Sequence, residues 1–85
     1  MCRLRIKPSA EKDLDRLRGE TWQRVRDALS ELRNNPRPVG CVKPTDSPSW
    51  RIRVGDWRAI YDIDDAAQGV TILRIKHRKD VYRDF

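Results

Sequence analysis

The stretch from Trp50 to Ile63 constrains the fold most, because two runs of alternating apolar and polar residues flank a glycine-containing turn. The turn is Gly55-Asp56, and a period of two on both sides of such a pair predicts a β-hairpin. Side chains of a strand point alternately to its two faces, so each strand has one largely apolar face. The opposite face then carries the arginines of this stretch, which are Arg51, Arg53 and Arg58. Three guanidinium groups on one open sheet face suit a phosphate or carboxylate ligand.

The size and charge of the chain limit what it can do. Its 85 residues predict a single domain, residues 1–85, with a small core. The formal net charge of +6 favours an anionic partner such as nucleic acid or an acidic protein. No apolar run approaches the roughly 20 residues that span a bilayer, and the first residues do not resemble a signal peptide. We therefore expect a cytoplasmic protein with no membrane role.

The cysteines and the histidine argue against a metal site or a cofactor. Cys2 and Cys41 are far apart, no CxxC pair exists, and the chain has one histidine. This usage predicts two reduced thiols, no bound metal and no cofactor.

The N-terminal part of the chain predicts a strand and two helices. Residues 3–7 alternate as a strand does, and Pro8-Ser9 ends it, with Ser9 as the N-cap of a first helix. That helix has an apolar stripe and a solvated side to which Asp13 is assigned, and Gly19 ends it. A second helix is expected from Glu20 or Thr21 to the residues before Pro36. Its apolar stripe consists of Trp22, Val25, Leu29 and Leu32, with Ala28 beside it. Two such helices form an αα-hairpin.

The C-terminal part predicts a loop over residues 35–49, the hairpin, a turn at 64–69 and a last strand from about Val70 to Ile75. The facing of that last strand is ambiguous. If Leu73 and Ile75 point to the core, then Val70 and Ile72 fall on the open, arginine-bearing face. The predicted fold is α+β, in the order β-α-α-β-β-β, with an antiparallel sheet that packs one face on the N-terminal helical hairpin.

Three segments carry a resemblance to a known family. They are Asn35-Pro36-Arg37-Pro38 with Gly40, then Trp50-Arg51-Ile52-Arg53-Val54-Gly55-Asp56-Trp57-Arg58-Ala59-Ile60-Tyr61, and last His77-Arg78-Lys79-Asp80-Val81-Tyr82-Arg83. They resemble the RelE/ParE toxin superfamily, whose typical sequence motifs are close to R-I-R-V-G-D-Y-R-V-I-Y followed by H-R-R-E-V-Y. The order of predicted elements agrees over nearly the whole chain.

The resemblance implies the toxin half of a toxin–antitoxin pair. RelE-like members of the superfamily cut messenger RNA in the ribosomal A site, whereas ParE-like members poison DNA gyrase. The functional positions of RelE-like members fall here on Arg51, Arg53, Arg58, Arg78 and Tyr82. This chain departs from the best-known RelE-like toxin, which has lysines where Arg51 and Arg53 stand. Arginine is not deprotonated at working pH, so neither residue is a natural general base.

The residues support a metal-independent endoribonuclease. In such a reaction the neighbouring 2′-hydroxyl attacks the phosphate, and arginines stabilise the charge that develops there. We assign this role to Arg58 and Arg78, and we assign RNA binding to Arg51, Arg53, Lys76 and Lys79. His77 is the candidate for proton transfer, because histidine is the residue type whose ordinary pKa lies nearest neutrality. Tyr82 is expected to stack on a base or to transfer a proton.

Other functions remain open at this stage. The first is ParE-like inhibition of DNA gyrase, which works by protein contact and needs no catalytic set. The second is a family member that binds its antitoxin but has lost catalytic activity. The arginine face then serves as a solvated or antitoxin-binding surface. In every case we expect a cognate antitoxin and a toxin–antitoxin hetero-oligomer, and the ribonuclease hypothesis adds messenger RNA on the ribosome.

Overall fold

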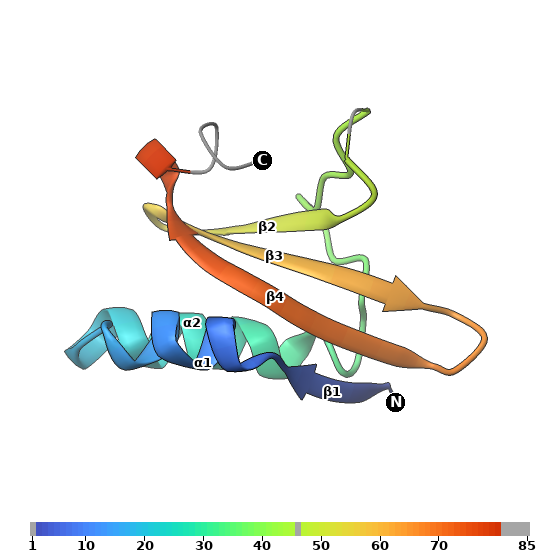
Figure 1. Ribbon diagram of the computed structural model, residues 1–85, viewed down its shortest axis with the longest axis horizontal. Coiled ribbons are helices and arrows are strands. Elements are labelled where there is room, and N and C mark those ends of the chain that lie inside the picture. The colour runs from blue at the N-terminus through green and yellow to red at the C-terminus, as the bar shows by residue number, and fades with distance from the viewer. Residues whose placement is uncertain (1, 46, 81–85) are drawn as a thin grey trace.

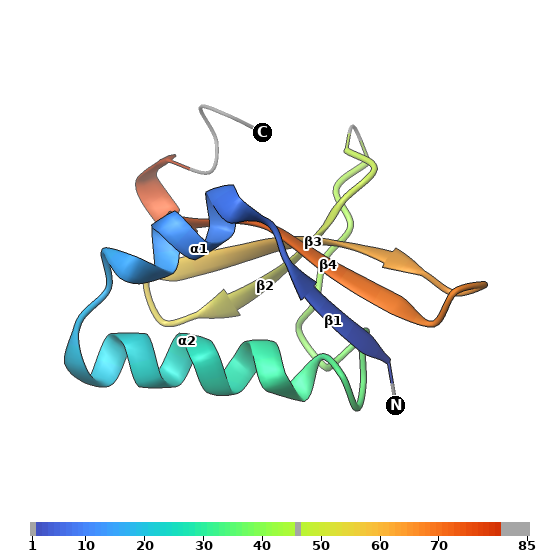
Figure 2. The same ribbon diagram turned by 60° about the horizontal axis from the view of Figure 1, so that its bottom comes forward.

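The computed structural model describes residues 2–45 and 47–80, and it confirms the α+β fold and the order of its elements (Figure 1). The elements are β1 (Arg3–Ile6), α1 (Pro8–Asp15), α2 (Gly19–Glu31), β2 (Trp50–Val54), β3 (Trp57–Asp64) and β4 (Gly69–His77). Both helices cover the same face of the sheet (Figures 1 and 2). No helix of the described residues is long and apolar enough to cross a membrane.

The four strands form one sheet in the order β1-β4-β3-β2. Strands β2, β3 and β4 are antiparallel, as predicted, but β1 pairs with β4 in parallel, so the sheet is mixed. Parallel neighbours cannot be joined by a tight hairpin, and here the two strands are the first and the last in the chain. The prediction of a wholly antiparallel sheet was therefore wrong for β1.

The core lies between the helices and the sheet, and the predicted stripe of α2 is confirmed. Val25, Leu29 and Leu32 are buried, and Trp22 and Ala28 are partly buried against the same cluster. The sheet contributes Ile52, Ala59, Tyr61, Val70, Ile72 and Ile75. Burial of these side chains is the main favourable contribution to folding in a domain of this size.

A β-bulge in β4 corrects the predicted facing of that strand. Tyr61 pairs with Ile72 and the preceding Ile60 pairs with Arg74, so Leu73 is an extra residue without an opposite partner. An extra residue reverses the alternation of side chains along the rest of the strand. Ile72 and Ile75 both face the core for this reason, and Val70 joins them at 1% exposure. Of the facings that the sequence leaves open, the one that puts Val70 and Ile72 on the open face is excluded.

Helix α1 closes the part of the β4 edge that β1 leaves uncovered. The hydroxyl of Ser9 donates to the carbonyl of Leu73 at 2.9 Å, and the amide of Ile75 donates to the Asp13 carboxylate at 2.9 Å. Asp13 is therefore buried at 7% exposure, and its assignment to the solvated side of α1 was wrong. Ser9 is not the N-cap either, because α1 already begins at Pro8, with Lys7 as its N-cap. Proline is favoured at the first helical position because its missing N–H has no helical partner there.

Candidate phosphate-binding site

The sheet face turned away from the helices carries a row of cations across three strands. Arg53 of β2 pairs directly with Arg58 of β3, and Arg58 pairs with Lys76 of β4. Like charges directly opposite one another destabilise a sheet. A neighbouring anion relieves that repulsion, so this arrangement favours an anionic ligand.

Four arginines meet in one cleft at the β2 side of this row. The cleft has a volume of about 310 Å³, and it is lined by Gly40, Val42, Arg51, Ile52, Arg53, Arg58 and Arg78. Of the described residues that line it, none is acidic. Arginine presents a planar set of N–H donors that matches the oxygens of a phosphate. The hairpin and the end of β4 thus build a site with the charge and the donors for phosphate.

The hairpin turn fixes the orientation of two of these arginines. Arg58 donates from Nη1 to the carbonyls of Gly55 at 3.0 Å and Trp57 at 2.9 Å, which leaves the far side of its guanidinium for a ligand. The amide of Arg78 donates to the carbonyl of Asp56 at 2.8 Å, and its Nε lies 3.8 Å from the Asp56 carboxylate. Gly55 has a φ of 60°, a conformation that favours glycine.

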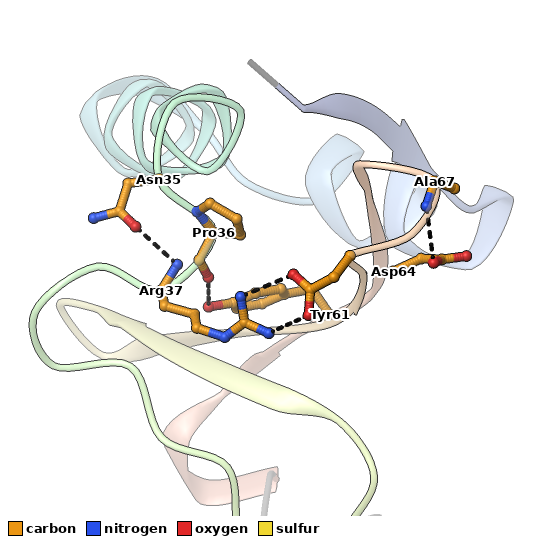
Figure 3. Close-up of polar contacts among 7 residues, drawn as sticks. Asn35, Pro36, Arg37, Tyr61, Asp64 and Ala67 are labelled. Carbon is orange, nitrogen blue, oxygen red and sulfur yellow. Dashed lines mark hydrogen bonds and ion pairs between the residues drawn. The ribbon is translucent and has the colours of Figure 1, made fainter.

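The loop that forms the remaining wall of the cleft is held down at its start (Figure 3). The buried hydroxyl of Tyr61 donates to the carbonyl of Pro36 at 2.8 Å. Arg37 binds Asp65 with two hydrogen bonds, of 3.1 and 2.9 Å. Burial raises the pKa of Tyr61, and the hydrogen bond from Arg37 lowers the pKa of the Asp65 carboxyl. These contacts join the loop to β3 and to the β3–β4 turn.

The same loop also packs on Trp50, the residue that follows it in the chain. The Arg37 guanidinium lies 5.2 Å from the centre of the Trp50 ring, and the Lys43 ammonium lies 5.9 Å from it. Both distances are in the range of cation–π attraction. Between these two residues, Val42 exchanges two backbone hydrogen bonds with Arg51, of 2.9 and 2.7 Å. Val42 is thereby fixed beside the cleft.

Comparison with known proteins identifies the family. The sequence model of one protein family, the ParE toxin of type II toxin–antitoxin systems, matches residues 4–82. The chain belongs to the RelE/ParE toxin superfamily. Its sequence is 34% identical to Toxin RelG of Mycobacterium tuberculosis over an alignment of 84 positions, which covers 94% of this chain and 94% of that one.

Solved structures of this superfamily agree with the fold. The toxin–antitoxin complex RelBE2 of Mycobacterium tuberculosis contains a chain 27% identical to this one, with a TM-score of 0.74 over 91% of this chain and 98% of that one. The archaeal RelE–RelB complex of Pyrococcus horikoshii contains a chain at 25% identity, with a TM-score of 0.80 over 91% of this chain and 94% of that one. The chain is thus the toxin of a toxin–antitoxin system.

The structure brings together some of the residues that the sequence singled out and separates others. Arg51, Arg53, Arg58 and Arg78 share the cleft, and Lys76 extends the row of cations beside Arg58. Lys79 is exposed and does not line the cleft, and Tyr82 lies outside the described residues.

His77 lies away from the four arginines, contrary to the expectation that it joins them. It pairs with Trp57, and the two rings meet edge to face at a centroid distance of 5.3 Å. Trp57 points to the face opposite Arg58, because neighbouring residues of a strand alternate. His77 instead lines a separate hollow of about 150 Å³ next to α1. This separation could have been predicted from the sequence. Lys76 lies beside Arg58, and His77 follows Lys76, so the alternation of a strand turns His77 to the other face.

Proposed function

We propose that this toxin is a RelE-like endoribonuclease that cleaves messenger RNA in the ribosomal A site. The observation that carries the proposal is the cleft of four arginines, in which none of the described lining residues is acidic. A protein that inhibits gyrase by contact alone has no need to gather guanidinium groups into a hollow. A phosphodiester in the cleft would receive hydrogen bonds and charge compensation from several arginines at once.

The reaction proposed for this cleft uses the RNA as its own nucleophile. The 2′-oxygen forms a bond to phosphorus, the bond from phosphorus to the 5′-oxygen breaks, and the products are a 2′,3′-cyclic phosphate and a 5′-hydroxyl. The proton of the 2′-hydroxyl leaves to a base, and the 5′-oxygen gains one. Negative charge accumulates on the phosphoryl oxygens in the transition state. Arg58 and Arg78 stabilise that charge, and Arg51 and Arg53 hold the phosphate between them.

The cleft is less well equipped for proton transfer than for stabilising charge on the phosphate. The described residues that line the cleft include four arginines and no histidine, and His77 is separated from the cleft. A protonated guanidinium is a donor and not a natural proton acceptor. Alignment of the 2′-oxygen with the breaking bond can itself lower the barrier by about 7 kcal/mol or more. We propose that the ribosome supplies this alignment, which makes cleavage dependent on it.

Replacing His77 by glutamine is expected to leave the cleavage rate within about threefold of the wild type, because the side chain does not reach the phosphate site. Single-turnover cleavage on programmed ribosomes between pH 6 and 9 measures this. The wild type and His77→Gln should show the same pH profile. A cleavage rate lower by a hundredfold or more would show that His77 takes part in catalysis. So would a change of slope near neutral pH that is present in the wild-type profile and absent from that of the variant.

The decisive test of the proposed function is a cleavage assay with purified components. The toxin is mixed with a defined messenger RNA, with and without programmed ribosomes, and the ends of the fragments are mapped. We expect cuts only with ribosomes, and fragments that begin with a 5′-hydroxyl. Folded toxin that makes no cut in either condition would exclude the proposal.

Inhibition of DNA gyrase is the second candidate, because the matching family model is that of a ParE toxin. A supercoiling assay with purified gyrase separates the two functions. Inhibition of supercoiling by the wild type, together with intact RNA in the ribosome assay, would favour the gyrase function.

The partner proposed for this toxin is an antitoxin, since similar chains were solved as toxin–antitoxin complexes. An antitoxin that neutralises the arginine cleft should present acidic side chains to it, and its affinity should then fall as salt rises.

A further inference from the structure

We propose that Val42 contacts the ribose or nucleobase next to the scissile phosphate and so contributes to the choice of cleavage site. This inference rests on the proposed ribonuclease function and names a residue that selects within its substrate. It begins from an unusual feature of the cleft, an exposed apolar side chain on a wall otherwise rich in arginine.

The two large apolar side chains that are exposed in the described part of the chain belong to one loop. Val39 and Val42 are 106% and 55% exposed. Exposure of an apolar side chain costs free energy in water, and single cases on a surface need no explanation. Their positions differ, however, because Val42 lines the cleft and Val39 is not among its lining residues.

The loop holds Val42 in place from both sides. Arg37 on one side and Lys43 on the other both lie over the Trp50 ring, at 5.2 and 5.9 Å. Arg37 is fixed further by Asp65. Gly40 has a φ of 93°, which lets the chain turn back toward β2. These contacts attach the loop to the sheet on both sides of Val42, so they fix the position of Val42 relative to the cleft.

The bridge between Val42 and Arg51 sets the direction of the valine side chain. The two residues are directly opposite in an isolated antiparallel bridge. Side chains of directly opposite residues share one face of a sheet. Val42 thus projects on the same side as Arg51, where the arginines gather.

The chemistry of the cleft then matches the parts of a nucleotide. The arginines suit the phosphate, whereas a rigid apolar group beside them suits the uncharged surface of a base or ribose. A small apolar contact discriminates between ligands by about ten- to two-hundredfold at most, so Val42 would bias cleavage between sites rather than dictate it.

The test compares Val42→Asn with Val39→Asn as a matched control, since both valines are exposed and lie in the same loop. Single-turnover cleavage is measured on programmed ribosomes that carry four messenger RNAs, which differ only in the A-site nucleotide next to the scissile phosphate. We expect Val42→Asn to raise the apparent KM about tenfold and to change the order of preference among the four RNAs. The rate at saturating toxin should change less, because Val42 does not touch the phosphate.

The outcomes separate this inference from the function on which it rests. If the wild type cuts and Val42→Asn keeps its KM and its order of preference, the role of Val42 is excluded while the ribonuclease function stands. The same holds if Val39→Asn shifts the preferences equally. If the folded wild type cuts no RNA with ribosomes, the proposed function fails and the role of Val42 fails with it. Thermal unfolding of both variants checks that each is folded.

Discussion

Replacing Arg58 by alanine is expected to slow cleavage on the ribosome about a hundredfold, which corresponds to about 2.7 kcal/mol of lost transition-state stabilisation. Arg58 lies between Arg53 and Lys76 in the row of cations, and its guanidinium is oriented by the carbonyls of Gly55 and Trp57. A donor held in this way needs little reorganisation when charge develops on the phosphate. The loss should therefore appear in the rate at saturating toxin and not only in the apparent affinity.

Two further variants make the Arg58 result specific. Arg58→Lys keeps the charge but loses the planar set of donors, so it should recover only part of the rate. Arg26→Ala removes the same charge from α2, where Arg26 lies 5.4 Å from the Trp22 ring, and should leave the rate within about threefold of the wild type. Equal rates for Arg58→Ala and the wild type would remove Arg58 from the site. Equal losses in Arg58→Ala and Arg26→Ala would show that net charge alone matters.

Strand alternation is the part of this molecule that the sequence predicts best. A period of two around Gly55-Asp56 is a local property of the chain, and it places Arg51, Arg53 and Arg58 on one face without knowledge of their neighbours. The structure confirms that grouping, and the contact of the Arg78 amide with the turn brings Arg78 into the same cleft, as the resemblance implies. Residues that meet because they share a hairpin can be predicted from pattern alone.

Contacts that depend on distant segments could not be predicted in the same way. The bulge at Leu73 is a property of the pairing between β3 and β4, so no count along β4 alone reveals it. The contact of Arg37 with Asp65 joins residues 28 positions apart. Both depend on how the elements pack, and the second shapes a wall of the candidate site.

The burial of Asp13 could be predicted in part, because its position in α1 indicates a residue that faces the core. It follows Ala10 by three residues and precedes Leu17 by four, which is the spacing of one helix face. Its charge suggested solvent, but its angular position suggested the core. A carboxylate at such a position needs donors, and the free edge of β4 provides them.

Replacing Asp13 by alanine is expected to lower the free energy of unfolding by about 2–3 kcal/mol. The carboxylate accepts hydrogen bonds from the Ile75 amide at 2.9 Å and from Nε and Nη2 of Arg74 at 2.8 and 3.2 Å. Alanine leaves the Ile75 amide unpaired. The Arg74 side chain is 36% exposed, so water compensates part of its loss, and the expected change is below that for a fully buried ion pair. In a domain of this size the melting temperature should fall by roughly 10–20 °C.

The effect should be confined to the carboxylate at position 13 and to the edge of β4. Asp15→Ala, two residues along α1, removes the same charge from an exposed position and should change stability by about 0.5 kcal/mol or less. Asp13→Asn keeps an oxygen for the Ile75 amide and should fall between the two. Hydrogen exchange at that amide should be faster in Asp13→Ala than in Asp15→Ala, beyond the change in global stability. Equal melting temperatures for the two alanine variants would mean that α1 does not need this carboxylate to hold β4, the strand that leads directly to Arg78.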